Sequence, residues 1–176
     1  MKDLSLHLID ILQNSTRAEA TEVYVGLIYN ETDKTLTLSI KDNGKGMSAE
    51  MVKNVTDPFC TSRTTRKVGL GIPLLKQNAE KTEGSFQIKS ELNQGTTVSA
   101  VFKYEHVDML PLGDIGGAMA LTISSWEKTE FEFDYKKGDN EFNLKTQDMK
   151  EVLEGVPLSN PQVINYIKEI INENIK

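Results

Sequence analysis

The spacing of apolar and polar positions predicts that the chain begins with an amphipathic helix. Over residues 3–20 apolar side chains recur every three or four residues, which is the period of a helix with one buried face. This predicted buried face consists of Leu4, Leu8, Ile11 and Leu12, together with Ser15. A polar stripe on the same helix recurs at intervals of 3, 4 and 3 residues, and its members are His7, Asp10, Asn14 and Arg17.

Alternating and β-branched segments follow, and they predict a sheet covered by helices. The expected elements are strands over 22–29 and 35–41, a short helix over 49–55, a loop over 60–68, a helix over 71–83, and a hairpin of strands over 85–92 and 96–104. Ser48 is expected to cap the short helix, with Met51 and Val52 inside it. Pro73 in the first turn and Gly84 just past the end delimit the later helix. This order predicts an α/β (α+β) two-layer sandwich with a mixed, largely antiparallel sheet.

The last third of the chain differs in charge, and we expect it to be a small α/β extension. Residues 1–102 carry 12 basic and 12 acidic side chains, whereas residues 103–176 carry 8 basic and 14 acidic ones. The expected elements here are a helix over 116–126, strands over 129–135 and 141–145, and a final helix capped by Ser159 or Asn160. We therefore divide the chain at residue 104 into domains 1–104 and 105–176. The apolar stripe of the final helix must cover something, which favours an extension integral to a single fold.

Composition sets limits on the classes of partner. The chain is 38% hydrophobic and 26% charged, which is typical of a globular protein. It has neither an apolar run long enough to span a bilayer nor the pattern of a signal peptide, so we expect a cytoplasmic protein without a membrane partner. The net charge of −6 argues against a nucleic-acid partner. The single cysteine, Cys60, cannot form an internal disulfide, and we expect it to be a packing residue.

Four short segments carry a resemblance to a known superfamily. They are Asp10–Asn14, Asp42–Met47, Asp57–Arg63, and Gly69–Gly71 with a later Gly95–Thr97. In this order they resemble the N box, first glycine box, F box and second glycine box of the GHKL superfamily, which holds the ATP-binding domains of DNA gyrase, heat-shock chaperones, mismatch-repair ATPases and bacterial histidine kinases. The resemblance covers roughly residues 3–102 and implies a Bergerat-type fold with ATP and Mg²⁺ as cofactors. No GxxxxGK[ST] motif occurs, which excludes a Walker-type site.

The resemblance also implies which residues contact the nucleotide. These positions are Asn14, Arg17, Asp42, Gly44, Gly46, Met47, Phe59, Thr61, Arg63, Gly69, Leu70, Gly71 and Thr96, with Thr97 as an alternative to Thr96. Asp42 is the residue expected to select adenine, because a carboxylate accepts a hydrogen bond from the exocyclic amine and guanine offers an acceptor there. Gly44 and Gly46 would allow the backbone to approach the nucleotide.

The N box implies a metal ligand and a candidate base. Asn14 would supply an amide oxygen to Mg²⁺, which prefers hard oxygen ligands. Asp10 occupies the position that is glutamate in gyrase-like hydrolases and commonly asparagine in histidine kinases, so it matches neither, and we treat it as the candidate catalytic base. Arg17 is either a phosphate contact or an ordinary surface arginine. For His7 we expect a surface or capping role.

Residues 61–71 are expected to be a lid over the triphosphate. Arg63, Arg66 and Lys67 lie among small hydroxylated residues, and the helix after the lid would present its N-terminal amides to anionic oxygens. Phe59 is expected to pack at the base of the lid as a hinge, with a core role as the alternative. The short spacing from Pro58 to the second glycine box resembles histidine kinases more than gyrase.

These observations predict a Mg²⁺-dependent ATP-binding protein with a histidine-kinase-like domain. We expect a stand-alone catalytic subunit that transfers the γ-phosphate to a separate protein, since the sequence contains no pair of long helices presenting a phosphoacceptor histidine. Asp10 favours a hydroxyl group or water as acceptor, whereas the lid pattern favours histidine. A slow ATPase switch and a nucleotide sensor that orders its lid for a partner remain open alternatives.

Overall fold

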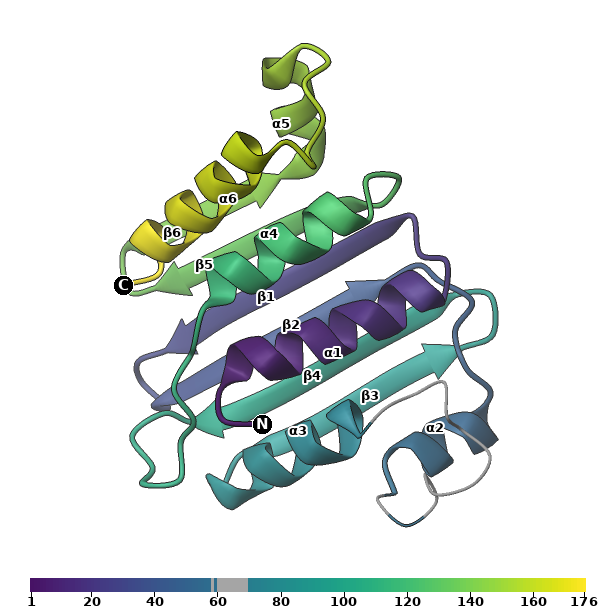
Figure 1. Cartoon of the computed structure of the whole chain (residues 1–176). Helices are drawn as coiled ribbons and strands as arrows, with labels where there is room; N and C mark the ends of the chain where they lie inside the picture. The colour runs from purple at the N-terminus through teal and green to yellow at the C-terminus, as the bar shows by residue number, and fades with distance from the viewer. Residues whose placement is uncertain (58, 60–69) are drawn as a thin grey trace.

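The computed structural model describes residues 1–57, 59 and 70–176 and arranges them as one sheet with helices on one face (Figure 1). The helices within these residues are α1 Leu4–Arg17, α2 Ala49–Val55, α3 Gly71–Lys81, α4 Ile115–Ser125, α5 Thr146–Leu153 and α6 Pro161–Asn174. The strands within them are β1 Glu22–Asn30, β2 Thr35–Asp42, β3 Ser85–Glu91, β4 Gly95–Lys103, β5 Glu130–Lys137 and β6 Asn140–Lys145. None of these helices is both long and apolar enough to cross a bilayer.

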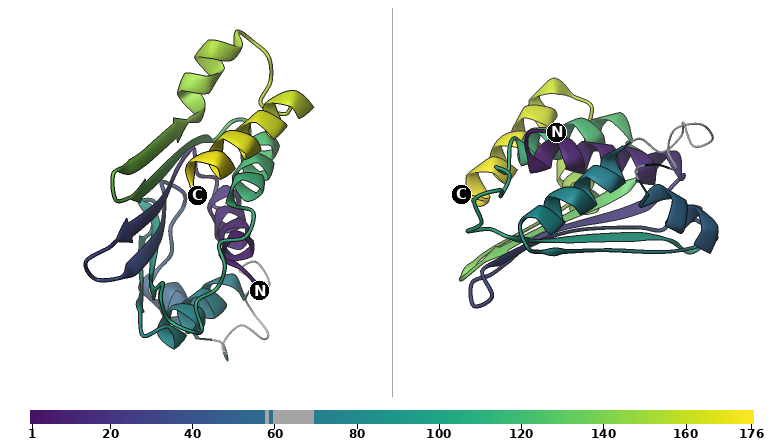
Figure 2. Two further views of the ribbon diagram at one scale, coloured as in Figure 1. Left: turned by 90° about the vertical axis from the view of Figure 1, so that its left-hand side faces the viewer. Right: turned by 90° about the horizontal axis from the view of Figure 1, so that it is seen from below.

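The sheet has the strand order β3-β4-β2-β1-β5-β6. Every neighbouring pair is antiparallel except β1 and β5, which run parallel. Figure 2 shows the helices gathered on one side and the other side of the sheet left without a helix layer. The apolar and polar residues of β2 alternate because only one face of the sheet is covered. Leu36, Leu38 and Ile40 face the helices and are buried. The predicted two-layer sandwich with a largely antiparallel sheet is confirmed.

Helix α1 forms because its apolar stripe matches the helical period and its start is capped. The carboxylate of Asp3 accepts a hydrogen bond from the backbone N–H of Leu6 at 3.0 Å. All the residues of the predicted buried face are buried, Ser15 included. The expectation of a surface or capping role for His7 is wrong, because its side chain is 0% exposed. Its Nε2 accepts a hydrogen bond from the side-chain amide of Asn78 in α3 at 2.9 Å, so a polar partner on another helix makes this burial tolerable.

Residues 105–176 continue the same sheet and the same helix layer. Strand β5 pairs with β1 in the register Val25↔Phe133, and α4 packs against both α1 and α6. The apolar stripe of α6 is buried at Ile167 and Ile171, so this helix covers α4 and the β5 side of the sheet rather than facing solvent. The sequence pattern did not predict α5, which follows β6 without a break.

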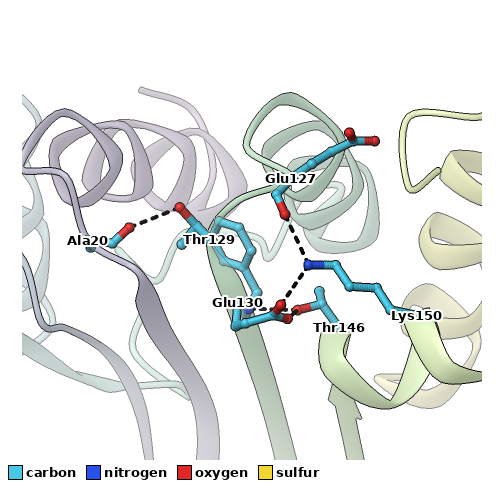
Figure 3. A network of polar contacts seen from close by, with 7 residues as sticks. Ala20, Glu127, Thr129, Glu130, Thr146 and Lys150 are labelled. Atoms are coloured by element: carbon cyan, nitrogen blue, oxygen red, sulfur yellow. Dashed lines mark hydrogen bonds and ion pairs between the residues drawn. The ribbon is translucent and has the colours of Figure 1, made fainter. Parts of the chain in front are cut away.

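Polar contacts tie the start of β5 to the first part of the chain (Figure 3). The buried hydroxyl of Thr129 donates to the carbonyl of Ala20 at 2.9 Å, and the backbone N–H of Glu130 donates to the carbonyl of Thr21 at 2.8 Å. The Glu130 carboxylate in turn accepts from Lys150 and from the Thr146 hydroxyl, each at 2.6 Å. The segment after α1 is therefore hydrogen-bonded to the start of β5, and the start of β5 is hydrogen-bonded to α5.

Candidate functional site

A cavity of about 680 Å³ opens between α1 and the ends of β2 and β4, with α2, α3 and the turn after β2 completing its walls. Its lining combines an apolar set with a polar set. The apolar side chains are Ile11, Ala18, Ile40, Met47, Met51, Ile72 and Val98. The polar side chains are Asn14, Ser15, Arg17, Asp42, Lys45 and Thr96. Such a mixture fits a ligand with a flat apolar part and a charged part.

Asp42 lies at the end of β2 and is held by two donors from the protein. Its Oδ2 accepts a hydrogen bond from the hydroxyl of Ser15 at 2.7 Å, and its Oδ1 accepts one from the backbone N–H of Gly44 at 2.9 Å. The side chain is buried but still lines the cavity. Each carboxylate oxygen has more than one lone pair, so both contacts fix the orientation while leaving acceptor capacity for a ligand.

The strand register decides between the two candidate threonines. Thr96 of β4 is the direct partner of Asp42 on β2, whereas Thr97 pairs with Lys41. Neighbouring residues on a strand point to opposite faces, so Thr96 shares the helix-covered face with Asp42 and Thr97 does not. Thr96 lines the cavity, and the structure therefore favours it.

The glycines after β2 occupy positions that admit no side chain. A Cβ on Gly44 would lie 2.7 Å from the carbonyl oxygen of Ala18, at the end of α1. Gly46 has a φ of +66°, and a Cβ there would lie 1.9 Å from the carbonyl oxygen of Glu91. Between them, the backbone N–H of Lys45 donates to the Ala18 carbonyl at 2.9 Å. This turn therefore packs between the end of α1 and the β3–β4 hairpin, and its residues Lys45, Gly46 and Met47 line the cavity.

The N-box residues form the other end of the cavity. Asn14 and Arg17 both line it from α1. Asp10 is half-buried one turn earlier, and burial raises its pKa above the usual value while the charge of Arg17 opposes the shift. This combination makes Asp10 a better proton acceptor than an exposed aspartate.

Helix α3 begins beside Asp10. Its first residue, Gly71, is buried, while Leu70 before it is 54% exposed. Among residues 1–57, 59 and 70–176, no side chain caps this end of α3. Uncapped N–H groups at a helix start are suited to anionic oxygens.

Much of the expected lid lies outside the described residues. This applies to the candidate site residues Thr61, Arg63 and Gly69, to the cations Arg66 and Lys67, and to Cys60. Phe59 is described, and its side chain is 89% exposed, so the alternative of a core role is wrong. The lid against which it is expected to pack as a hinge lies outside the described residues. The backbone N–H of Phe59 donates to Asp57 Oδ1 at 2.8 Å, which makes a local turn.

Comparison with known proteins identifies the family. The sequence model of the family described as "Histidine kinase-, DNA gyrase B-, and HSP90-like ATPase" matches residues 2–106, more than half of the chain. The chain belongs to this family. The resemblance to the GHKL superfamily is thereby confirmed, and the cavity lies within the matched region.

Curated relatives include proteins named as a sensor histidine kinase and as a heme sensor, and each matches about half of this chain. The sensor histidine kinase YvrG of Bacillus subtilis is 27% identical over 100 residues, which are 54% of this chain and 17% of that protein. The heme sensor protein HssS of Staphylococcus saprophyticus is 30% identical over 95 residues, which are 53% of this chain and 21% of that protein. The chain thus matches about a fifth of the length of these two relatives.

Among solved structures, the ATPase domain of Aquifex aeolicus MutL in complex with ADP has a TM-score of 0.59 and 16% sequence identity. The match covers 88% of this chain and 70% of that one, so it extends into residues 105–176. At this identity the likeness shows a shared fold.

Within this GHKL-family site, sequence reasoning overlooked three residues. Ser15 was assigned only to the buried face, although it orients Asp42; a serine in an apolar stripe was the available signal. Met51 was expected inside α2, but it is 43% exposed and lines the cavity, while Val55 is the buried residue of that helix. Lys45 lies between the two glycines and also lines the cavity, as a cation within the glycine box.

The residues present fit a divalent cation that is shared with a ligand. No group of three or more His, Cys, Asp or Glu side chains within residues 1–57, 59 and 70–176 is placed to hold a metal ion by itself. Asn14 and Asp10 offer two oxygen-bearing side chains one turn apart, with Asn14 lining the cavity. Mg²⁺ keeps several waters and often binds through one or two protein ligands plus substrate phosphates. This donor set is compatible with a metal that arrives with a triphosphate.

Proposed function

We propose that this protein binds Mg²⁺-ATP in the α1–β2–β4 cavity and transfers the γ-phosphate to a separate protein. The observation that carries the proposal is that one cavity holds two chemically different sets of residues. Asp42 and Thr96 stand side by side on adjacent strands, and Asn14 and Arg17 line the same cavity from α1. A purine nucleotide has the same division between base and phosphates.

At the base end, the fixed carboxylate supports selection of adenine. Ser15 and Gly44 each donate a hydrogen bond to the Asp42 carboxylate and so fix its orientation, and the remaining lone pairs can accept from a ligand. Adenine presents an amine at the 6-position, whereas guanine presents an acceptor oxygen there. A guanine base would place its acceptor oxygen against the buried carboxylate in place of a donor, and loss of that hydrogen bond costs about 1–3 kcal/mol or more for a charged group.

At the phosphate end, Asn14 would hold Mg²⁺ and Arg17 would contact a phosphate oxygen. The bound metal would neutralise charge on the triphosphate. Asp10 would take the proton of the attacking group, and its raised pKa suits that task. Leu70 and Gly71 would bring the uncapped start of α3 to the phosphates, next to Asp10.

A slow ATPase is the second candidate, and Asp10 is the observation that favours it. A carboxylate beside the phosphate end can accept a proton from water as well as from a hydroxyl group of a protein. Protein phosphorylation is placed first because one of the relatives, YvrG of Bacillus subtilis, is a sensor histidine kinase by name. The proposal covers both histidine and serine as the side chain that accepts the phosphate.

Incubation with γ-³²P-labelled ATP, with and without an extract of the source cells, separates the candidates. We expect label on a second protein and no transfer with the Asn14→Ala variant. Release of labelled phosphate without a labelled protein would favour the ATPase. ATP binding without either product would overturn both and favour a sensor.

A further inference from the structure

Three polar side chains stand in a row across the sheet at the base end of the cavity. Ser90 of β3 pairs with Thr96 of β4, and Thr96 pairs with Asp42 of β2. Direct cross-strand partners point to the same face, so all three lie on the helix-covered side. Thr96 and Asp42 line the cavity, whereas Ser90 stands behind Thr96 and does not line it.

The hydroxyl of Ser90 makes three contacts that together determine where its proton lies. The backbone N–H of Met47 donates to Ser90 Oγ at 2.8 Å, and Ser90 Oγ lies 3.0 Å from the carbonyl oxygen of Gly95. A carbonyl oxygen can only accept, so Ser90 is the donor to Gly95. With the Ser90 proton assigned to Gly95, we assign Thr96 as the donor in the third contact, which is 2.8 Å between Thr96 Oγ1 and Ser90 Oγ. A hydroxyl group has one proton and two acceptor sites, and this arrangement uses all three.

The consequence falls on Thr96. Its only proton is committed to Ser90, so Thr96 Oγ1 has only lone pairs left for the cavity. Asp42 next to it is also an acceptor, because its own contacts are with the donors Ser15 and Gly44. The base end of the cavity therefore presents two neighbouring acceptors and no hydroxyl proton from this pair.

We propose that Ser90 is a positioning residue that makes Thr96 an acceptor and so strengthens discrimination against 6-oxopurines. This inference rests on the proposed binding of ATP in this cavity. The 6-amino group of adenine offers two N–H donors, which match two acceptors. A 6-oxo group offers lone pairs, and it would face the lone pairs of both Asp42 and Thr96. Without Ser90, the Thr96 hydroxyl rotates and donates to the 6-oxo group. The unfavourable contact with Thr96 is then removed, and the one with Asp42 remains.

ATP and ITP are suitable probes of this effect, because they share the ribose and the triphosphate and differ only at the 6-position of the base and at the adjacent N1, which carries a proton in ITP. Calorimetric affinities for both nucleotides would be measured with the full chain and with the Ser90→Ala variant. We expect the ATP-to-ITP preference to fall about tenfold in Ser90→Ala, mainly through tighter ITP binding, which corresponds to about one hydrogen bond. Ser90→Thr keeps the hydroxyl group and is expected to keep the preference.

A double-mutant cycle tests that Ser90 acts through Thr96. Thr96→Val removes the hydroxyl group, so adding Ser90→Ala to it should change the nucleotide preference no further. A purely structural role for Ser90 predicts weaker binding of both nucleotides by the same factor and an unchanged preference. That result, or additive effects of the two substitutions, overturns the proposal. Failure of the proposed function is visible separately, as absence of ATP binding by the unmodified chain.

Discussion

Gly71, the first residue of α3, lies directly against Asp10 of α1. A Cβ on Gly71 would lie 2.8 Å from Asp10 Cβ and 3.1 Å from Asp10 Oδ2. The second glycine box is therefore in contact with the N box, although the two are far apart in the sequence. This contact places the candidate base beside the uncapped start of α3, where anionic oxygens are expected.

A methyl group at Gly71 should disturb this arrangement. Gly71→Ala is expected to lower ATP turnover by about 10²-fold, because Asp10 Cβ is fixed by the helix and one of the two helices must shift by a few tenths of an ångström or more. Phosphate release or phosphoryl transfer measures the effect. Gln77→Ala is the matched control, since Gln77 is exposed on the same helix and should have a small effect on turnover. Equal turnover in both variants would contradict the importance of the contact.

Replacement of the candidate adenine contact should weaken ATP binding. In Asp42→Asn one oxygen becomes an amide donor that faces the 6-amino group or the donors Ser15 and Gly44, which costs about 1–3 kcal/mol. Calorimetry should show an affinity for ATP lower by roughly tenfold or more. The unmodified chain should also prefer ATP to GTP, and equal affinities for the two nucleotides would remove Asp42 from the proposed role.

The metal ligand can be tested separately from the base contact. Asn14→Ala should abolish the Mg²⁺ dependence of ATP binding while leaving adenosine affinity largely unchanged, because the proposed adenine contacts Asp42 and Thr96 lie on β2 and β4. Titration of ATP with and without Mg²⁺ measures this difference, and Gln13→Ala, on the exposed side of the same helix, is the control. A variant that keeps full Mg²⁺ dependence would show that another residue holds the metal.

The buried His7 makes stability depend on pH. Burial lowers the pKa of His7 from 6.5 to about 4, so the neutral form is the folded form. Between these values the unfolded chain takes up a proton that the folded chain does not, and stability is lost as the pH falls from 6.5 to about 4. The loss from this group is on the order of 3 kcal/mol.

Urea unfolding at pH 7 and pH 4.5 measures that loss. His7→Gln should remove this part of the pH dependence, because glutamine can still meet Asn78 and does not titrate in this range. His106, which is partly exposed, provides the comparison through His106→Gln, where the acid sensitivity should remain. An unchanged pH profile in His7→Gln would show that His7 is not the responsible group.

Truncation after residue 104 should prevent cooperative folding. It would expose the edge of β1 that pairs with β5 and uncover the side of α1 that packs on α4. Large side chains such as Phe131 and Phe133 would be missing from the shared core. We expect residues 1–104 alone to show no cooperative melting transition by calorimetry. A soluble fragment that melts cooperatively and binds ATP like the full chain would show that 105–176 is a separable module.

A milder substitution probes the same junction. Thr129→Val removes the buried hydrogen bond to the Ala20 carbonyl without a change of shape, and it should cost about 1 kcal/mol. Thr37→Val, on the open face of the sheet, is the control and should have a smaller effect on the melting temperature.

Local pattern was sufficient for much of this protein. The helical period located α1 and its buried stripe, and strand alternation located β1 to β4 within one or two residues. Glycine spacing marked the turn at Gly44 and Gly46, where the structure leaves no room for a Cβ. These features depend on residues close in sequence, because helical and strand periods and backbone sterics act within a few positions.

Only the tertiary structure decided which distant residues meet. The choice of Thr96 over Thr97 needed the register of β2 with β4, and the role of Ser15 needed the position of Asp42. The burial of His7 needed Asn78 on another helix. Local periodicity predicts that a polar side chain in an amphipathic helix is exposed. It cannot show that a hydrogen-bond partner on a distant element allows the side chain to be buried.

The placement of the last third has the same origin. Its hydrophobic periods predicted a hairpin and two helices. The sequence offered no signal that β5 would pair in parallel with β1, a strand that lies about a hundred residues earlier in the chain. Strand pairing depends on which exposed edge and which apolar faces remain to be covered once the earlier elements have packed. The sequence by itself therefore determined the family motifs and every described element except α5. Long-range packing determined how the elements share one sheet and how the site residues orient one another.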